Sequence, residues 1–363
     1  MKGSLSLGRV AGISVFIHWS FLLLIGYIVF SSYRAGQDAV QTLWSVGFVL
    51  SIFLTVYLHE MGHALAARRY GIATRDITLL PIGGLARLER FPEKPVQELV
   101  VALAGPAVNV VIAIIVAVFI KFPAVDEMDG FVTGEVNAST FFFNFMVVNV
   151  WLVIFNLIPA FPMDGGRVLR SLLAMRLQRH VATKVAASIG QVLAIGFVIA
   201  GFYLNPFLVI IGIFIFVAAR GESEQVSNQF LLHGSKVRDA VMKETPALNA
   251  QSPVKDAVDK LLAGQAKNFL ITENGEPVGS LGRNELISAL AEGRQAESLA
   301  SVMNRNLVFL DGNMPLEEAW KKSLVDAPPL MLVRENGRLT GVLDTENIRE
   351  YIMVRDALAK SNQ

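Results

Sequence analysis

Three residues capable of metal and acid–base chemistry lie close together early in the chain. His59 and His63 are four positions apart and flank Glu60 within SIFLTVYLHEMGHALAARRYGI, residues 51–72. On an α-helix, positions i and i+4 share one face, so both imidazoles can bind one metal ion. Zinc accepts imidazole nitrogen readily, and a catalytic site keeps one position for water, whose pKa falls to about 7. The spacing therefore predicts a zinc site with Glu60 as the general base.

A third protein ligand is expected, and Asp164 in NLIPAFPMDGGRVLRSLL is the candidate. Asn156, Pro159 and Pro162 interrupt the apolar run before it, so this stretch cannot be a plain helix. Irregular backbone at membrane depth requires protein or a water-filled cavity to satisfy its polar groups. Asp164 could equally cap the helix that begins after it, and the local pattern by itself favours capping.

These residues must be positioned by membrane-spanning helices. Of 363 residues, 53% are hydrophobic and 17% are charged, with a mean hydropathy of +0.49. A span needs roughly 20 mainly apolar residues. Six candidates lie at about 15–32, 44–67, 99–120, 140–161, 185–203 and 205–220. Because no small-residue cleavage site follows the first run and more spans come after it, we do not expect a cleaved signal peptide.

The distribution of charge predicts orientation. Two loops are basic, with the residues Arg68, Arg69, Arg75, Arg87, Arg90 and Lys94 in one and Arg167, Arg170, Arg176, Arg179 and Lys184 in the other. The opposite loops carry only Arg34 and Lys121, next to Asp126, Glu127, Asp129 and Glu135. By the positive-inside rule, both termini are cytoplasmic in a multi-pass cell-membrane protein. The chain has no cysteine and a net charge of +1, so we expect neither disulfides nor a nucleic-acid partner.

The two motifs together resemble the site-2 protease family of intramembrane zinc metalloproteases. The family signatures are H-E-x-x-H in one span and N-x-x-P…D-G in a later one. They match His59-Glu60-x-x-His63 and Asn156-x-x-Pro159 with Asp164-Gly165. The resemblance covers about residues 1–220. It implies one Zn²⁺ per chain, Asp164 as the third ligand, and a role for Asn156 in positioning the substrate backbone.

Two further segments resemble the family. LPIGGLARLER, residues 80–90, is similar to its glycine-containing hairpin near the active site. There, Gly83 and Gly84 could pair with an unwound substrate, although an ordinary cytoplasmic turn is the alternative. AGPAVNV, residues 104–110, matches G-P-x-x-N in the third span. Its Asn109 is an auxiliary residue, either structural or catalytic. For His18, which is also in an apolar run, we expect a packing or interfacial role.

The composition becomes that of a soluble protein after about residue 220. A polar linker at 221–234 precedes two similar units at 235–298 and 299–363. Each unit has a strand, an Asn-Gly turn, a second strand and a helix. The pair resembles CBS-type domains, an α+β fold that often binds adenine nucleotides. Gly282, Glu285, Asp344 and Asn347 depart from the usual nucleotide-binding residues. A structural, self-associating pair therefore remains open beside a nucleotide sensor.

We therefore expect an α-helical polytopic membrane protein of about six spans with a C-terminal CBS pair. The predicted function is that of a zinc endopeptidase that cleaves the transmembrane or juxtamembrane segment of membrane proteins, with the CBS pair regulating it or docking substrates. The alternative is a CBS-regulated membrane metal or ion transporter. Glu60 distinguishes the two, because a transporter needs metal ligands but no base beside them.

Overall fold

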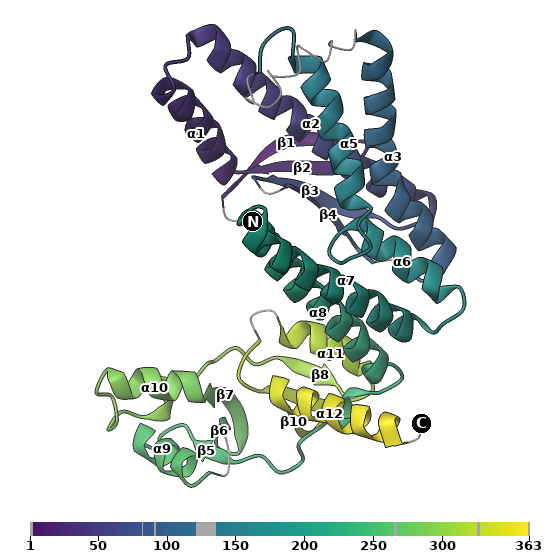
Figure 1. The fold of residues 1–363 in the computed structure, drawn as a ribbon. Helices are drawn as coiled ribbons and strands as arrows, with labels where there is room; N and C mark the ends of the chain where they lie inside the picture. The colour runs from purple at the N-terminus through teal and green to yellow at the C-terminus, as the bar shows by residue number, and fades with distance from the viewer. Residues whose placement is uncertain are drawn as a thin grey trace. The chain divides into compact units, whose positions relative to one another are not determined.

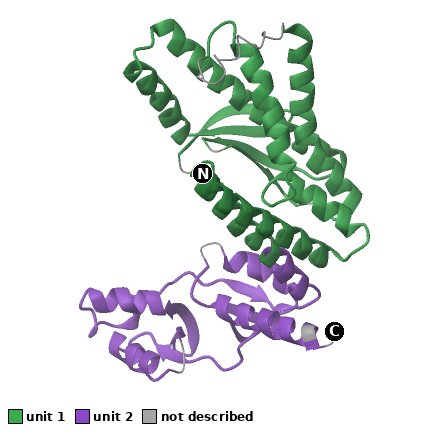
Figure 2. Cartoon of the chain, in the orientation of Figure 1, with its two compact units in different colours: residues 1–224 green, residues 225–363 purple. Residues whose placement is uncertain are grey.

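The computed structural model describes residues 3–81, 83–90, 92–120, 136–264, 267–324 and 327–361. The chain forms two compact units, Met1–Glu224 and Gln225–Gln363 (Figure 2). The helix α8, Phe207–Leu232, crosses this boundary. Most of the expected linker at 221–234 is therefore helical, because its Glu, Gln and Ser residues are compatible with a helix and its Leu231 and Leu232 are buried.

The first unit is mainly helical. Besides α8 it contains α1 Ser20–Arg34, α2 Ala39–Arg69, α3 Pro95–Phe119, α5 Phe141–Asn156, α6 Asp164–Ala174 and α7 Arg179–Tyr203 (Figure 1). Within the described residues, α2, α3 and α7 are long and apolar enough to cross a membrane, and α1 and α5 are shorter apolar helices. Of the six expected spans, three are thus supported by helices of sufficient length and apolar composition. The acidic segment 121–135 used for the orientation lies outside the described residues.

A four-stranded sheet in the first unit was not predicted. Its strands are β1 Ser4–Val10, β2 Ile13–His18, β3 Thr74–Leu80 and β4 Gly83–Leu88, in the order β1-β2-β3-β4. Strands β2 and β3 are parallel, and the other pairs are antiparallel. The expected first span at 15–32 was therefore wrong at its start, because residues 15–18 belong to β2. Ile13 and Val15 are buried at alternate positions, as in a strand. Because the residues around them are also apolar, this alternation cannot be recognised in the sequence.

The sheet supports the helix that carries the histidines. Ile13 and Ile77 from the sheet form a buried cluster with Met61 and Ala64 of α2. Asp38 caps α2, since its carboxylate accepts a hydrogen bond from the Gln41 backbone N–H at 2.7 Å. The helix ends on two arginines that suit the negative helix terminus. The His-bearing half of α2 is thus held between the sheet and α3.

A sharp chain reversal brings α6 toward α2 and α3. Helix α5 ends at Asn156, and α6 begins at Asp164 after seven non-helical residues. A Cβ atom at Gly165 would lie 2.2 Å from the Ile158 carbonyl oxygen, and one at Gly166 would lie 2.7 Å from Ala160 backbone carbon. Only glycine permits this packing of α6 against the preceding loop.

Helices α7 and α8 form a hairpin that covers this loop. The Asn205 side chain accepts a hydrogen bond from the Phe207 backbone N–H at 2.9 Å, which closes the turn before α8. Ala160 and Met163 of the loop are buried with Ala194 of α7 and Ile215 of α8. This packing buries Ala160 and Met163, whereas Leu157, Pro159 and Pro162 of the same loop are exposed.

The second unit contains two similar α+β halves. The first has β5 Ala247–Asn249, α9 Val254–Leu262, β6 Asn268–Glu273, β7 Glu276–Gly282 and α10 Arg283–Ala291. The second has β8 Phe309–Asp311, α11 Leu316–Ser323, β9 Met331–Glu335, β10 Arg338–Leu343 and α12 Thr345–Ser361. Asn274 and Asn336 both have positive φ, at 52° and 50°, and each precedes a glycine with positive φ. These are the predicted Asn-Gly hairpin turns.

Candidate metal centre

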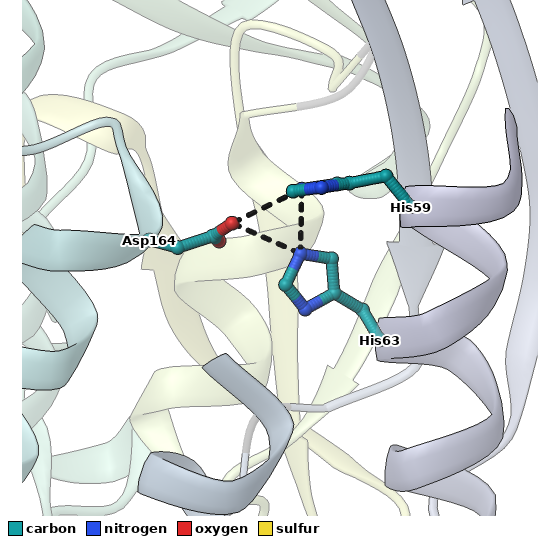
Figure 3. A group of neighbouring side chains, drawn as sticks. All are labelled: His59, His63 and Asp164. Atoms are coloured by element: carbon teal, nitrogen blue, oxygen red, sulfur yellow. Dashed lines mark hydrogen bonds and ion pairs between the residues drawn. The ribbon is translucent and has the colours of Figure 1, made fainter. Parts of the chain in front are cut away.

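Three buried side chains from distant parts of the sequence converge in the first unit. His59 and His63 lie one turn apart on α2, and Asp164 is the first residue of α6. Asp164 Oδ2 is 3.1 Å from His59 Nε2 and 3.0 Å from His63 Nε2, and the two Nε2 atoms are 3.1 Å apart. Figure 3 shows the Asp164 carboxylate pointing toward both rings. All three residues are less than 8% exposed.

The other ring nitrogens are held by oxygen atoms. His63 Nδ1 lies 2.7 Å from the Val101 carbonyl oxygen, which can only accept a hydrogen bond. His59 Nδ1 lies 2.6 Å from Asn109 Oδ1, while Asn109 Nδ2 donates to Asn149 Oδ1 at 3.2 Å. Both histidines therefore carry their proton on Nδ1 when neutral and direct the lone pair of Nε2 inward.

This donor set fits a zinc ion. When both histidines are neutral, two lone pairs and a carboxylate oxygen meet with no proton between them, an arrangement that repels unless a cation neutralises it. Two imidazoles and one carboxylate are a common ligand set for catalytic zinc, and outer hydrogen bonds on Nδ1 are typical of metal-binding histidines. Among the described residues, His59, His63 and Asp164 are the group of His, Asp and Glu side chains close enough to hold a metal.

The capping alternative for Asp164 does not describe its side chain. The N-cap residue of α6 is Met163, and no side chain caps this helix. The carboxylate of Asp164 instead faces the two imidazoles of α2, 105 and 101 positions earlier in the chain. The structure thus joins this residue to the histidines.

Glu60 lies next to the triad, against the edge of the sheet. Its Oε2 accepts a hydrogen bond from the Ala86 backbone N–H of β4 at 3.1 Å. A Cβ atom on Gly84 would lie 2.6 Å from Glu60 Cγ, so this glycine leaves room for the carboxylate. Gly83, the first residue of β4, has a φ of 140° and open space around it. The expected hairpin therefore lies directly beside Glu60.

Asn109 and Asn156 have different positions. Asn109 is fully buried and bonds His59, as described above. Asn156 ends α5, is partly exposed, and donates from Nδ2 to the Leu152 carbonyl oxygen of its own helix at 2.8 Å. The structure does not connect Asn156 to the triad. His18 lies at the end of β2, where its ring contacts Ser20 Oγ at 2.6 Å.

Two residues of the site were missed at the level of sequence. Gly105 of α3 faces both imidazoles, and a Cβ atom there would lie 2.2 Å from His63 Nε2 and 2.7 Å from His59 Nε2. Asn149 of α5 is fully buried and bonds Asn109. A signal was present in both cases, since Gly105 lies within the motif of residues 104–110 and Asn149 is a polar residue in an apolar run.

Comparison with known proteins agrees with this geometry. Residues 47–199 match the model of peptidase family M50, and residues 299–354 match the CBS domain. The chain is 28% identical over 349 residues to a zinc metalloprotease of Methanocaldococcus jannaschii, covering 96% of each. It is 30% identical over 282 residues to a Mycobacterium tuberculosis protein named as zinc metalloprotease Rip3, covering 73% of this chain and 70% of that protein.

The solved site-2 protease of Methanocaldococcus jannaschii is also similar. It shares 32% identity with this chain, covers 61% of it and 95% of its own length, and superposes with a TM-score of 0.44. The relatives do not favour the transporter alternative. They confirm the predicted resemblance and the predicted zinc cofactor. The chain belongs to peptidase family M50, the site-2 protease family, and is a membrane zinc metalloendopeptidase that also carries CBS domains.

Proposed function

We propose that this enzyme cleaves membrane proteins within or beside a transmembrane segment. The observation that carries the proposal is the burial of His59, His63 and Asp164 between α2 and α6, where α2 is long and apolar enough to cross a membrane. A peptide substrate that reaches this depth must itself come from a membrane segment. Its helix must open locally, because a hydrogen-bonded helix shields its carbonyl groups.

His59, His63 and Asp164 would hold the zinc, and Glu60 would act as the general base. When bound, the zinc ion supplies Lewis-acid chemistry that makes water a nucleophile near neutral pH. Glu60 then accepts the proton of the attacking water on its carboxylate and passes it to the leaving amine. The Ala86 N–H bond to Glu60 Oε2 keeps this carboxylate oriented. Such a base contributes about 10²–10⁴-fold to the rate.

The edge of β4 that faces away from β3 offers a binding surface for an opened substrate. Strand β4 is at the end of the sheet, paired on one side with β3. The Ala86 N–H donates to Glu60, so the edge that faces away from β3 lies alongside the base. An extended peptide added to this edge would use main-chain hydrogen bonds, with Gly83 and Gly84 allowing close approach. We assign Asn156 to the same substrate path and Asn109 to the orientation of His59.

We also propose a domain organisation for the chain. Residues 1–220 form the protease domain, 221–234 connect it to the tail, and 235–298 and 299–363 form two CBS-type units that regulate cleavage or dock substrates. The basic loops support a cytoplasmic location for both termini by the positive-inside rule. Because the chain lacks cysteine, single cysteines can report orientation. One introduced within 121–135 should react with an impermeant reagent in intact cells, whereas one at Glu93 should not.

The function is tested by comparing membrane proteomes of cells that express the wild type or Glu60→Gln. The variant should retain zinc and lose at least one cleavage fragment, because only the base has changed. Glu89→Gln is a matched control, since Glu89 is an exposed carboxylate just after β4. If Glu60→Gln leaves every membrane-protein fragment in place while retaining zinc, the proposal is wrong.

A further inference from the structure

A cluster of charged side chains is built around a buried ion pair between α6 and α3. Arg170 of α6 is 1% exposed, which makes it the largest fully buried side chain among the described residues. Its Nε donates to Glu98 Oε1 of α3 at 2.9 Å, and its Nη2 donates to the same oxygen. Glu98 is itself 4% exposed. A buried charge pair of this kind is strongly destabilised when one partner is removed.

Two more charges complete the cluster. Arg170 Nη1 donates to Glu222 of α8, and Arg179, the first residue of α7, lies 3.7 Å from Glu98 Oε2. Arg179 also donates to the Pro92 carbonyl oxygen at 2.7 Å. Two arginines therefore face two glutamates, and their formal charges balance. The four residues come from α3, α6, α7 and α8, so the cluster joins α6 to three other helices.

The cluster is connected to Asp164 through α6 and the loop before it. Arg170 lies six residues further along α6, a distance of about 9 Å on a helix. Its guanidinium lies 5.0 Å from the ring centre of Phe161, in the loop that leads to Asp164. Its partner helix α3 also provides Val101 and Asn109, which hold the two histidines. The Arg170–Glu98 pair thus fixes the helix of one metal ligand to the helix that orients the other two.

We propose that Arg170 is the positioning residue that keeps Asp164 beside His59 and His63. Because Arg170 also bonds Glu222, the position of Asp164 depends on the position of α8. Helix α8 continues to Leu231 and Leu232, which lie in the hydrophobic core of the C-terminal unit. A shift of α8 that withdraws Glu222 leaves Arg170 buried with one carboxylate. The cluster then rearranges to regain charge balance, and α6 moves with it. The CBS-bearing unit can in this way adjust the strength of metal binding.

This inference rests on the proposed role of Asp164 as a ligand. Measuring the metal affinity of separate variants distinguishes a failure of the inference from a failure of that ligand role. Purified full-length protein is titrated with Zn²⁺ against a chelator, and with Co²⁺ to record the visible spectrum of the bound ion. Glu222→Gln should weaken Zn²⁺ binding by about 10-fold and change the Co²⁺ spectrum, within the range of about 10–100-fold typical of outer residues of metal sites. Arg170→Lys should have a larger effect, because lysine cannot reproduce the forked contacts.

Glu224→Gln is the matched control. Glu224 lies two residues after Glu222 on the same helix and pairs with exposed Arg220 at 2.7 Å, so its loss should leave Zn²⁺ affinity unchanged. A purely structural role would lower the unfolding temperature of Glu222→Gln but leave its metal affinity and Co²⁺ spectrum as in the wild type, and that result overturns the inference. If Asp164→Ala itself keeps full affinity, the ligand assignment fails as well.

Discussion

Gly105 offers a direct test of the metal centre, because its missing side chain leaves the space in which the ligand atoms meet. In Gly105→Ala, the new Cβ would lie 2.2 Å from His63 Nε2, 2.5 Å from His63 Cε1 and 2.7 Å from His59 Nε2. Ordinary contact begins at 3.4 Å, so the His63 ring would have to move by about 1.2 Å. Zinc sites tolerate deviations of about 0.2 Å in ligand distance.

The helix itself should accept the alanine. Replacing glycine by alanine inside a helix stabilises it by about 1 kcal/mol, so a loss of metal cannot be attributed to a weaker α3. We expect Gly105→Ala to remain folded and to bind Zn²⁺ more than about 100-fold more weakly. This exceeds the effect typical of outer residues, because two ligands are displaced at once.

The assay is competition for Zn²⁺ between the purified protein and a chelator, with unfolding temperature measured in parallel. Gly47→Ala is the matched control: Gly47 lies on α2, the helix of the two histidines, and a Cβ there meets nothing within 4 Å. It should bind zinc as the wild type does. One zinc per chain at wild-type affinity in Gly105→Ala would refute the assignment of His59 and His63 as ligands in this geometry.

Three other variants or ligands test neighbouring parts of the molecule. Asp164→Ala should lose both stoichiometric zinc and cleavage, and retention of both by elemental analysis and a substrate assay would restore the capping interpretation. Gly84→Ala places a Cβ 2.6 Å from Glu60 Cγ and 3.0 Å from Val56 Cγ1; it should lower kcat by up to about 100-fold with zinc content unchanged, as steady-state kinetics and metal analysis would show. Calorimetry of the full-length protein should detect at most weak binding of ATP or AMP. Asp344 has a carboxylate where the phosphate-binding hydroxyl is usual, and this carboxylate already accepts the Asn347 N–H at 2.8 Å at the start of α12. Micromolar affinity would contradict this prediction.

Part of the site was predictable because it is local. His59, Glu60 and His63 lie on one helix, so the i, i+4 rule places both imidazoles on one face without any knowledge of the fold. The family resemblance was carried by the same residues together with Asn156, Pro159 and Asp164. The Asn-Gly turns of the C-terminal unit were also predictable, since their positive φ angles are a property of two adjacent residues.

The fold was predicted less completely, for reasons of packing. An apolar run is compatible with a buried strand as well as a span, and β2 was therefore assigned to the first span. Its strand character depends on pairing with β3, about 60 residues away along the chain. The helical continuation of α8 past residue 220 also depends on burial of Leu231 and Leu232 in the second unit.

The kind of chemistry follows from local residue order, because two imidazoles and a carboxylic base stand at helical spacing in an apolar chain. The position of Asp164 beside the two imidazoles depends on tertiary packing, because a carboxylate before two glycines is locally as compatible with a helix cap as with metal binding. Tertiary packing likewise determines the contacts of Gly105, Asn149 and Arg170. Their contacts reach across helices, and the free energy of such contacts depends on distances that no local pattern contains.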